Sequence, residues 1–298
     1  MGIAIDEKCI LSIIIPVYNR QETFNSLMAD LSQAITNNKL EHKIEVIVID
    51  DASSVPLILP AFPSKLICER NQKNSGAPYS RARGLKLSLG KFIHFHDSDD
   101  SISDSWLIDL ITELTAKPDI DILVTGRVDF EHQSINERFS KFFNKQVHDS
   151  KRVLSRLIYW NYIGPIGGVT FSRKVLESIK IRRIASCQDW QMYIDAIKNS
   201  TIMSSRPDIQ FMFHKTGDDR ISHNPRKKIL GHLQLAKQTH KDSIFGRHIR
   251  LFYLYACKQH IYNKGGFILA FYKKHQLQIF MTFLVIAAYS FMPRLRKP

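Results

Sequence analysis

Residues 91–100, KFIHFHDSDD, join a short apolar run to three carboxylates at positions 97, 99 and 100. Asp97, Asp99 and Asp100 repel one another unless a cation lies between them or one of them stays protonated. One explanation is a turn before a helix N-cap, since Asp and Ser accept hydrogen bonds from free amides at a helix start. The other explanation is a site of hard oxygen ligands for a divalent cation.

The spacing excludes an EF-hand loop. Counted from Asp97, the sixth position is Ile102 where glycine is needed, and the twelfth is Ile108 where glutamate is needed. The remaining possibility is one or two carboxylates that leave room for phosphate oxygens and water. Mg²⁺ and Mn²⁺ favour that arrangement.

Composition limits the class of protein. The chain has 298 residues with 44% hydrophobic content, enough for one large domain or two modest ones. Its four cysteines lie far apart, which argues against a disulfide scaffold or a zinc ribbon and fits a reducing cytoplasm. The apolar stretch at residues 10–17 is broken by Ser12 and Pro16, and we interpret it as a strand and not a signal peptide.

The net charge of +14 is concentrated at the C-terminus. Residues 1–225 are nearly neutral, whereas residues 226–298 carry 14 basic side chains and a single acidic one, Asp242. Residues 276–293 are uncharged, and as a helix they would measure about 27 Å, slightly short of a bilayer core. We expect residues 226–298 to form a basic, amphipathic helical tail that binds an anionic membrane surface, by lying on it or by crossing it. The alternative is a terminal helix packed on the preceding domain.

Apolar runs alternate with helical patterns through the first 125 residues. Strands are predicted at 11–15, 43–49, 65–67, 91–95 and 119–125, with helices at 21–37, 79–89 and 105–116. Such a pattern predicts an α/β fold with a Rossmann-like, mostly parallel sheet and helices on both faces. Ligands of these sheets bind beyond the carboxyl ends of the strands. The polar sequences PVYN, DDASS and HDSDD follow three of these strands, so we expect them to share one site.

Four blocks together resemble glycosyltransferase family 2 in their order and spacing. They are LSIIIPVYNR, VIVIDDASS, NSGAPYSRARGLKLSLGKFIHFHDSDD and CQDW. The resemblance covers residues 10–225 and includes bacterial enzymes that build O-antigens and other surface polysaccharides. It implies an inverting enzyme of the GT-A fold in residues 1–225. Residues 1–125 would be the nucleotide-sugar-binding half and residues 126–225 the acceptor half.

The resemblance also assigns roles to individual residues. Ten positions are implied to bind the nucleotide sugar: Pro16, Val17, Tyr18, Asp50, Asp51, Asn74, Gly76, Arg83, Asp97 and Ser98. Asp97, Asp99 and Asp100 are implied to hold Mn²⁺ or Mg²⁺, and which of them binds it directly stays open. Asp189 is implied as the catalytic base, with a helix N-cap as its alternative role. His214 and Arg220 lie where relatives place groups near the diphosphate.

The function expected from this resemblance is transfer of a sugar from a nucleotide donor, UDP-linked, to a lipid-linked or oligosaccharide acceptor. The lipid carrier would be a polyprenyl diphosphate at the inner face of the cell membrane, in O-antigen or capsule synthesis. No zinc finger or RNP-like motif indicates nucleic acid as a partner. Two alternatives stay open. One is a nucleotidyltransferase on a similar sheet, and the other is a non-catalytic, basic membrane-binding protein with a degenerate transferase domain.

Overall fold

The computed structural model describes residues 9–129, 134–135, 147–157, 161–214, 227, 230–232 and 234–235. The chain divides into two compact units. The first unit contains residues 1–153, 162–183 and 195–216, and the second contains residues 154–161, 184–194 and 217–298. Most of the expected basic tail lies outside the described residues. Within the described residues, no helix has the length and apolar character needed to cross a membrane.

The N-terminal half of the first unit builds four neighbouring parallel strands of the sheet. Its elements are β1 (Leu11–Val17), α1 (Gln21–Asn37), β2 (Ile44–Asp50), β3 (Lys65–Arg70), α2 (Ala77–Leu87) and β4 (Phe92–Phe95). β1 pairs in parallel with both β2 and β4, and β2 pairs in parallel with β3. Each strand and helix predicted for this half is present. Helix α2 begins two residues earlier than expected, because Pro78 is well placed in a first helical turn.

Among the residues that the structure describes, the remaining elements complete a nine-stranded mixed sheet. They are α3 (Asp104–Ala116), β5 (Ile122–Asp129), β6 (Ser134–Ile135), β7 (Val147–His148), α5 (Ser150–Leu157), η1 (Ile166–Gly168), β8 (Val169–Ser172), α6 (Arg173–Glu177), α7 (Gln188–Lys198) and β9 (Met203–Phe213). The main strand order is β3-β2-β1-β4-β8-β5-β9-β7. β8 runs antiparallel between β4 and β5, and the sequence did not predict it.

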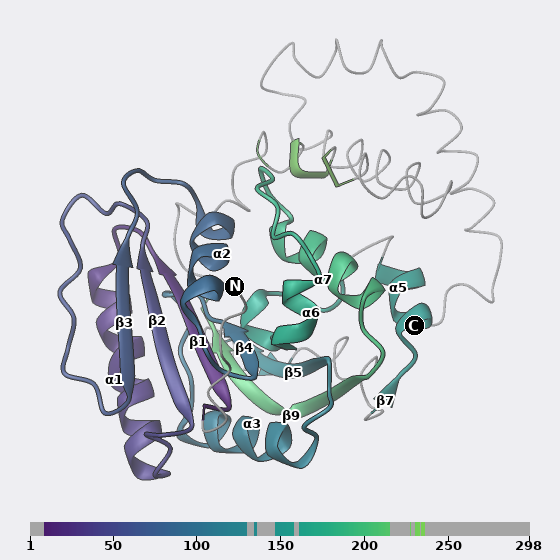
Figure 1. Cartoon of the computed structure of the whole chain (residues 1–298), viewed down its shortest axis with the longest axis horizontal. Helices are drawn as coiled ribbons and strands as arrows, with labels where there is room; N and C mark the ends of the chain where they lie inside the picture. The colour runs from purple at the N-terminus through teal and green to yellow at the C-terminus, as the bar shows by residue number, and fades with distance from the viewer. Residues whose placement is uncertain are drawn as a thin grey trace, which may run out of the picture. The chain divides into compact units, whose positions relative to one another are not determined.

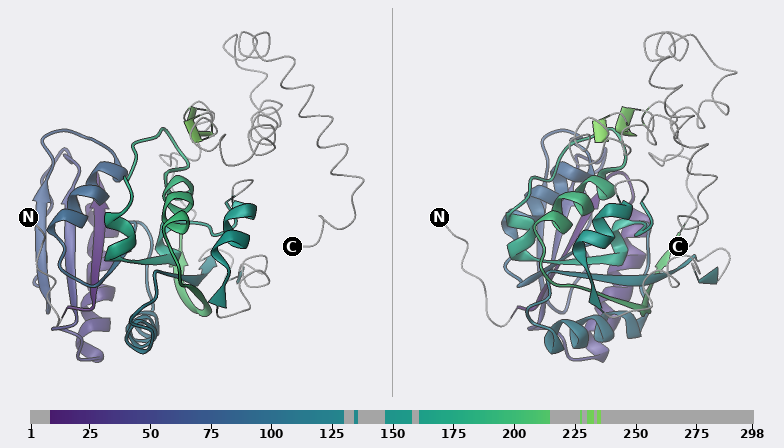
Figure 2. Two further views of the ribbon diagram at one scale, coloured as in Figure 1. Left: turned by 45° about the vertical axis from the view of Figure 1, so that its right-hand side comes forward. Right: turned by 90° about the vertical axis from the view of Figure 1, so that its right-hand side faces the viewer.

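Helices cover both faces of the parallel strands (Figure 1, Figure 2). Leu11, Ile13 and Ile15 of β1 belong to the core that also contains the buried sides of α1 and α3. Ile14 points to the other face, where Gly84 of α2 lies against it. β1 and β2 are buried at every position, which accounts for their mostly apolar sequences, and the buried polar residues Ser12 and Glu45 are hydrogen-bonded to each other. The predicted α/β class is confirmed.

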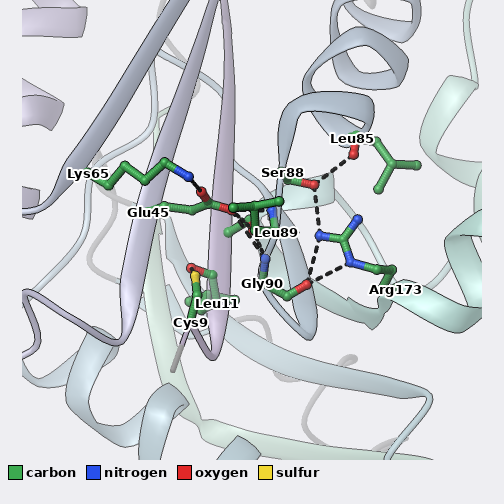
Figure 3. Close-up of polar contacts among 10 residues, drawn as sticks. Cys9, Leu11, Glu45, Lys65, Leu85, Ser88, Leu89, Gly90 and Arg173 are labelled. Carbon is green, nitrogen blue, oxygen red and sulfur yellow. Dashed lines mark hydrogen bonds and ion pairs between the residues drawn. The ribbon is translucent and has the colours of Figure 1, made fainter. Parts of the chain in front are cut away.

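A buried polar cluster fixes the turn that leads into β4 (Figure 3). Glu45 of β2 accepts hydrogen bonds from Ser12 Oγ (2.7 Å), from Lys65 Nζ (3.0 Å) and from the backbone amides of Leu89 and Gly90. On the other side of the turn, Arg173 Nε donates to the carbonyl oxygen of Gly90 (2.9 Å). The turn is therefore clamped from β2 and from α6, and β4 enters the sheet in a defined position.

Candidate active site

The carboxyl ends of β2, β1 and β4 lie next to one another, because β1 is the central strand of the three. The loops that leave these ends begin at residues 18, 51 and 96. They are the three polar clusters that the sequence placed at one edge. This edge of the first unit contains most of the predicted site residues.

The loop after β1 is held by Asn19. Its φ angle is 52°, a left-handed conformation that Asn tolerates better than most residues. Asn19 N–H donates to Ser53 Oγ (2.9 Å), and Ser54 N–H donates to Asn19 Oδ1 (2.7 Å). These bonds tie the loop after β1 to the loop after β2. Pro16 and Val17 are buried at the end of β1, whereas Tyr18 is 44% exposed and leaves its ring accessible.

Two neighbouring carboxylates at the end of β2 are buried and organise the backbone around them. Asp50 accepts from Ser53 N–H (2.8 Å) and from the guanidinium of Arg70 (2.5 Å). Asp51 Oδ1 accepts from Asn71 Nδ2 (2.7 Å) and from Ser75 N–H (2.9 Å). Both residues therefore stabilise the local structure at the edge where the sequence predicts nucleotide binding.

Asp51 Oδ2 accepts from the backbone amide of Gly76 at 2.6 Å. Gly76 has a φ angle of 85°, which a residue with a side chain rarely adopts. The Asp51 carboxylate therefore shapes the loop of residues 71–76 that precedes α2. Asn74, in the same loop, is exposed. The predicted nucleotide contacts of Asp51, Asn74 and Gly76 stay predictions.

Two arginines of α2 have different tasks. Arg83 donates to Arg70 O (2.7 Å), Asn71 Oδ1 (2.9 Å) and Glu69 Oε2 (2.5 Å). Arg81 is 5% exposed and forms an ion pair with Asp97, with 2.7 Å between Nη2 and Oδ1. Sequence reasoning selected Arg83 and overlooked Arg81. Helical spacing was the available signal, since Arg81 lies three residues before Gly84, which contacts β1.

The carboxylate loop after β4 is a tight turn. Asp100 N–H donates to the carbonyl oxygen of Asp97 at 3.1 Å. Asp99 forms an ion pair with Arg20, the residue before α1, with 2.5 Å between Oδ2 and Nη1. Asp100 is 3% exposed, and its Oδ1 accepts from His214 N–H at 3.1 Å. Ser98 is buried in the same turn. Each of the three carboxylates has a named protein partner.

The end of β9 lies beside this loop. Ser101 and Met212 form an antiparallel bridge, with backbone hydrogen bonds of 3.0 and 2.9 Å. Ser101 Oγ also lies 2.7 Å from His214 Nε2. His214, which the sequence placed near the diphosphate, is therefore close to the carboxylate loop. Arg220 lies outside the described residues.

A buried histidine pair lies below the carboxylate loop. His94 Nδ1 is 3.0 Å from Thr170 Oγ1, and His94 Nε2 is 3.3 Å from His96 Nδ1. Trp106 packs on both rings. Burial lowers the pKa of His96 to about 4, although Asp97, the backbone of Asp100 and Asp99 each act to raise it. Burial lowers the pKa of His94 well below its ordinary value, and His96 lowers it further. Both rings are neutral near pH 7.

The donor set of the carboxylate loop suits a hard divalent cation, because it consists of carboxylate oxygens. The side chains of Asp97 and Asp99 are 33% and 18% exposed, whereas Asp100 is buried. Among the described residues, no three His, Cys, Asp or Glu side chains are arranged to hold a metal ion. Asp97 is paired with Arg81 and Asp99 with Arg20, and the role of these carboxylates as metal ligands stays a prediction.

Asp189 belongs to the second unit, in the first turn of α7. Cys187, just before this helix, has a left-handed φ of 60°, and its carbonyl oxygen accepts from Gln191 N–H at 3.0 Å. Trp190 Nε1 donates to Leu157 O at 2.6 Å. The start of α7 is thus fixed within its own unit. The role of Asp189 as the catalytic base stays a prediction.

Solved structures share this fold. The Staphylococcus aureus TarS fragment 1–349 in complex with UDP-GlcNAc has a TM-score of 0.63 and 20% identity, over 92% of this chain and 79% of that one. The Pyrobaculum calidifontis mannosyltransferase PcManGT in complex with GDP-Man and Mn²⁺ has a TM-score of 0.56 and 15% identity, over 94% of this chain and 86% of that one. The architecture that this chain shares with both is the GT-A-like fold.

The model of the protein family described as Glycosyl transferase family 2 matches residues 12–179, which is more than half of the chain. The chain therefore belongs to glycosyl transferase family 2. An uncharacterized glycosyltransferase of Haemophilus influenzae is 26% identical over 57% of this chain and 55% of its own length. The Escherichia coli UDP-Glc:alpha-D-GlcNAc-diphosphoundecaprenol beta-1,3-glucosyltransferase WfaP is 36% identical over 30% of this chain and 36% of its own length. The chain thus spans about half of the first relative and about a third of the second.

Proposed function

We propose that this protein is an inverting, metal-dependent glycosyltransferase that moves a sugar from a UDP-linked donor to a glycan acceptor. The observation that supports this most strongly is the convergence of three loops at one sheet edge. Asp51 lies on the loop after β2, and Asp97 and Asp99 lie on the loop after β4. Arg81 of α2 pairs with Asp97, and Arg20, in the loop after β1, pairs with Asp99. A site of this kind can neutralise and orient a diphosphate.

The donor would bind across the ends of β1 and β2. The exposed ring of Tyr18 offers a surface for stacking a nucleotide base. The loop of residues 71–76 presents its backbone next to α2 and is fixed by Asp51. UDP as the nucleotide is supported by the UDP-GlcNAc complex of TarS and by the UDP-Glc donor in the name of WfaP.

The divalent cation would be held by Asp99, with Asp97 beside it. Asp100 is the least suited of the three, because it is buried and one of its oxygens already accepts from His214 N–H. A bound Mn²⁺ or Mg²⁺ offsets negative charge on the leaving diphosphate. The Mn²⁺ complex of PcManGT supports this assignment of the cofactor.

The acceptor side requires a base that removes the proton from the attacking hydroxyl. Asp189 would supply it. A single displacement by that hydroxyl at the anomeric carbon inverts its configuration and needs no covalent intermediate on the enzyme. The protein's own contribution to the step is to orient the two substrates and to take up one proton on a carboxylate oxygen.

A polyprenyl-diphosphate-linked acceptor is supported by the diphosphoundecaprenol acceptor in the name of WfaP. The strongly basic residues 226–298 suit a protein that works at an anionic membrane surface. We therefore propose a role in bacterial surface-polysaccharide synthesis, such as O-antigen or capsule, at the inner face of the cell membrane.

A donor screen tests this proposal. Thermal unfolding is measured with a panel of UDP-, GDP- and CMP-sugars, each with and without Mn²⁺. We expect a UDP-sugar to raise the melting temperature only when Mn²⁺ is present. Asp189→Asn should keep that shift while losing sugar transfer. A donor-induced rise in melting temperature that is the same with and without Mn²⁺ would contradict the metal-dependent site. Full sugar-transfer activity of Asp189→Asn would rule out Asp189 as the base.

A further inference from the structure

The two partly exposed carboxylates of the carboxylate loop are paired with arginines of different burial. The side chain of Arg81, which holds Asp97, is 6% exposed. The side chain of Arg20, which holds Asp99, is 25% exposed. The nitrogen–oxygen distance is 2.7 Å in the pair of Arg81 with Asp97 and 2.5 Å in the pair of Arg20 with Asp99. Arg81 belongs to α2 and Arg20 is the residue before α1, so the two arginines reach the loop from different elements.

We propose that Arg20 is a placeholder for the divalent cation. In the metal-free enzyme its guanidinium neutralises Asp99, and when the cation and donor bind, Asp99 changes partner from Arg20 to the metal. Arg20 then pairs with the anionic diphosphate of the donor in the same complex. This inference rests on the proposed function, and it adds a residue that sets the order and strength of metal binding.

Burial explains why Arg20 moves and Arg81 does not. A buried arginine that loses its carboxylate partner keeps its charge in a poorly solvated place, at a large cost in free energy. Arg81 is buried and would carry this cost, so its ion pair with Asp97 persists when the cation binds. Arg20 can turn toward water or toward a phosphate at little cost, and a guanidinium binds phosphate oxygens with two parallel hydrogen bonds. The exchange is therefore expected at Asp99.

The local backbone supports a side chain that swings on a fixed base. Arg20 O accepts from Phe24 N–H (3.0 Å), which anchors the residue to the first turn of α1. Asn19, just before it, is tied to Ser53 and Ser54. The Arg20 side chain makes no capping bond to this helix. Its backbone can stay in place while the guanidinium changes partner.

Metal affinity in the absence of nucleotide tests the exchange. Mn²⁺ alone is titrated into the full-length protein, and free Mn²⁺ is measured by electron paramagnetic resonance. Arg20→Gln should bind Mn²⁺ about twofold to fivefold more tightly than the unaltered protein, because the competing ion pair is gone. Arg20→Lys, which keeps the charge, should stay close to the unaltered protein. Unchanged or weaker Mn²⁺ binding by Arg20→Gln would overturn the proposal.

A charge-matched control separates direct competition from a general change of the field. Lys73 is an exposed cation in the loop of residues 71–76, at the same sheet edge. Lys73→Gln removes one positive charge but frees no carboxylate of the carboxylate loop. It should change Mn²⁺ affinity less than Arg20→Gln does. Equal gains from both variants would overturn the exchange and leave only a long-range electrostatic effect.

A second measurement uses the unaltered protein. The guanidinium ¹⁵N resonances are followed by nuclear magnetic resonance during titration with diamagnetic Mg²⁺, first alone and then with UDP. The Arg20 signals, assigned by comparison with Arg20→Lys, should shift in both steps while those of Arg81 keep their ion-paired positions. Arg20 signals that do not respond would overturn the exchange. If the unaltered protein takes up Mg²⁺ and UDP normally in that case, the proposed function stands; if it takes up neither, both fall.

Discussion

The Asp51 carboxylate accepts a hydrogen bond from the backbone N–H of Gly76 at 2.6 Å, although the two residues are 25 positions apart in the chain. The same carboxylate accepts from Asn71 and Ser75. One buried side chain at the end of β2 thus fixes the entry to α2, whose first turns carry Arg81 to the carboxylate loop. If Asp51 also binds the donor as proposed, donor binding and local stability are coupled through this residue.

Asp51→Asn should lower both stability and donor affinity. The amide group of Asn presents N–H donors where the native carboxylate accepts from N–H groups, so buried donors lose their partners. We expect a loss of about 1–3 kcal/mol in the free energy of unfolding. Urea unfolding measures this loss, with Asp109→Asn on the exposed side of α3 as a charge-matched control. Equal stability of the two variants would show that the loop of residues 71–76 does not depend on Asp51.

Gly84→Ala should destabilise the contact between α2 and β1. A Cβ atom at this position would lie 2.4 Å from Ile14 Cγ2, well inside van der Waals contact. We expect a loss of about 1–3 kcal/mol from overpacking. The double variant Gly84→Ala with Ile14→Ala removes the clashing methyl and should lose less than the sum of the two single variants. Strict additivity in thermal unfolding would contradict the close contact.

Glu45 should make the fold sensitive to acid. Burial alone would raise the pKa of Glu45, but hydrogen bonds from Leu89 N–H, Ser12 and Lys65, with the charge of Lys65, hold it below its ordinary value. The charged form is therefore favoured in the folded state. Its contribution is fully present above the unfolded pKa of about 4.3 and disappears as the pH falls through the lower folded value.

The corresponding experiment compares Glu45→Gln with the unaltered protein by urea unfolding between pH 7 and pH 3. The difference in unfolding free energy should be largest near pH 7 and should shrink below about pH 4. Glu22→Gln, at an exposed position of α1, is the matched control and should show a smaller difference at every pH. A Glu45→Gln difference that is constant across the range would mean that folding does not shift the pKa of Glu45.

The parallel half of the fold was predictable because its signals are local. Short apolar runs separated by helical patterns define β1, β2 and β4 and the helices between them. β8, VTFS, is only four residues long and follows the three-residue 3₁₀ helix η1, so no long helical pattern marks its N-terminal side. Its position depends on antiparallel pairing with β4 and β5, strands more than 40 residues earlier in the chain. No local pattern encodes such a pairing.

The sequence predicted the carboxylates of the site, but it did not predict the two arginines, Arg20 and Arg81, that pair with them. Asp51 and Asp97 follow buried strands, and strand ends of a parallel sheet meet at one edge. Arg20 and Arg81 lie inside the same sequence blocks, but their partners are set by the orientation of the helices. Arg81 and Arg83 are two positions apart and face different sides of α2, so a motif alone does not tell which one reaches the site.

The most direct test of the account is the metal dependence of UDP binding in Asp99→Asn. Isothermal titration of UDP is carried out with excess Mn²⁺ and with excess chelator, for the unaltered protein, Asp99→Asn and the control Asp109→Asn. We predict that Mn²⁺ strengthens UDP binding by about tenfold or more in the unaltered protein and in Asp109→Asn, in line with the loss of affinity known for metal-site variants. Asp99→Asn should bind UDP equally weakly with and without Mn²⁺. A full Mn²⁺ enhancement in Asp99→Asn would contradict the assignment of the carboxylate loop as the metal and diphosphate site.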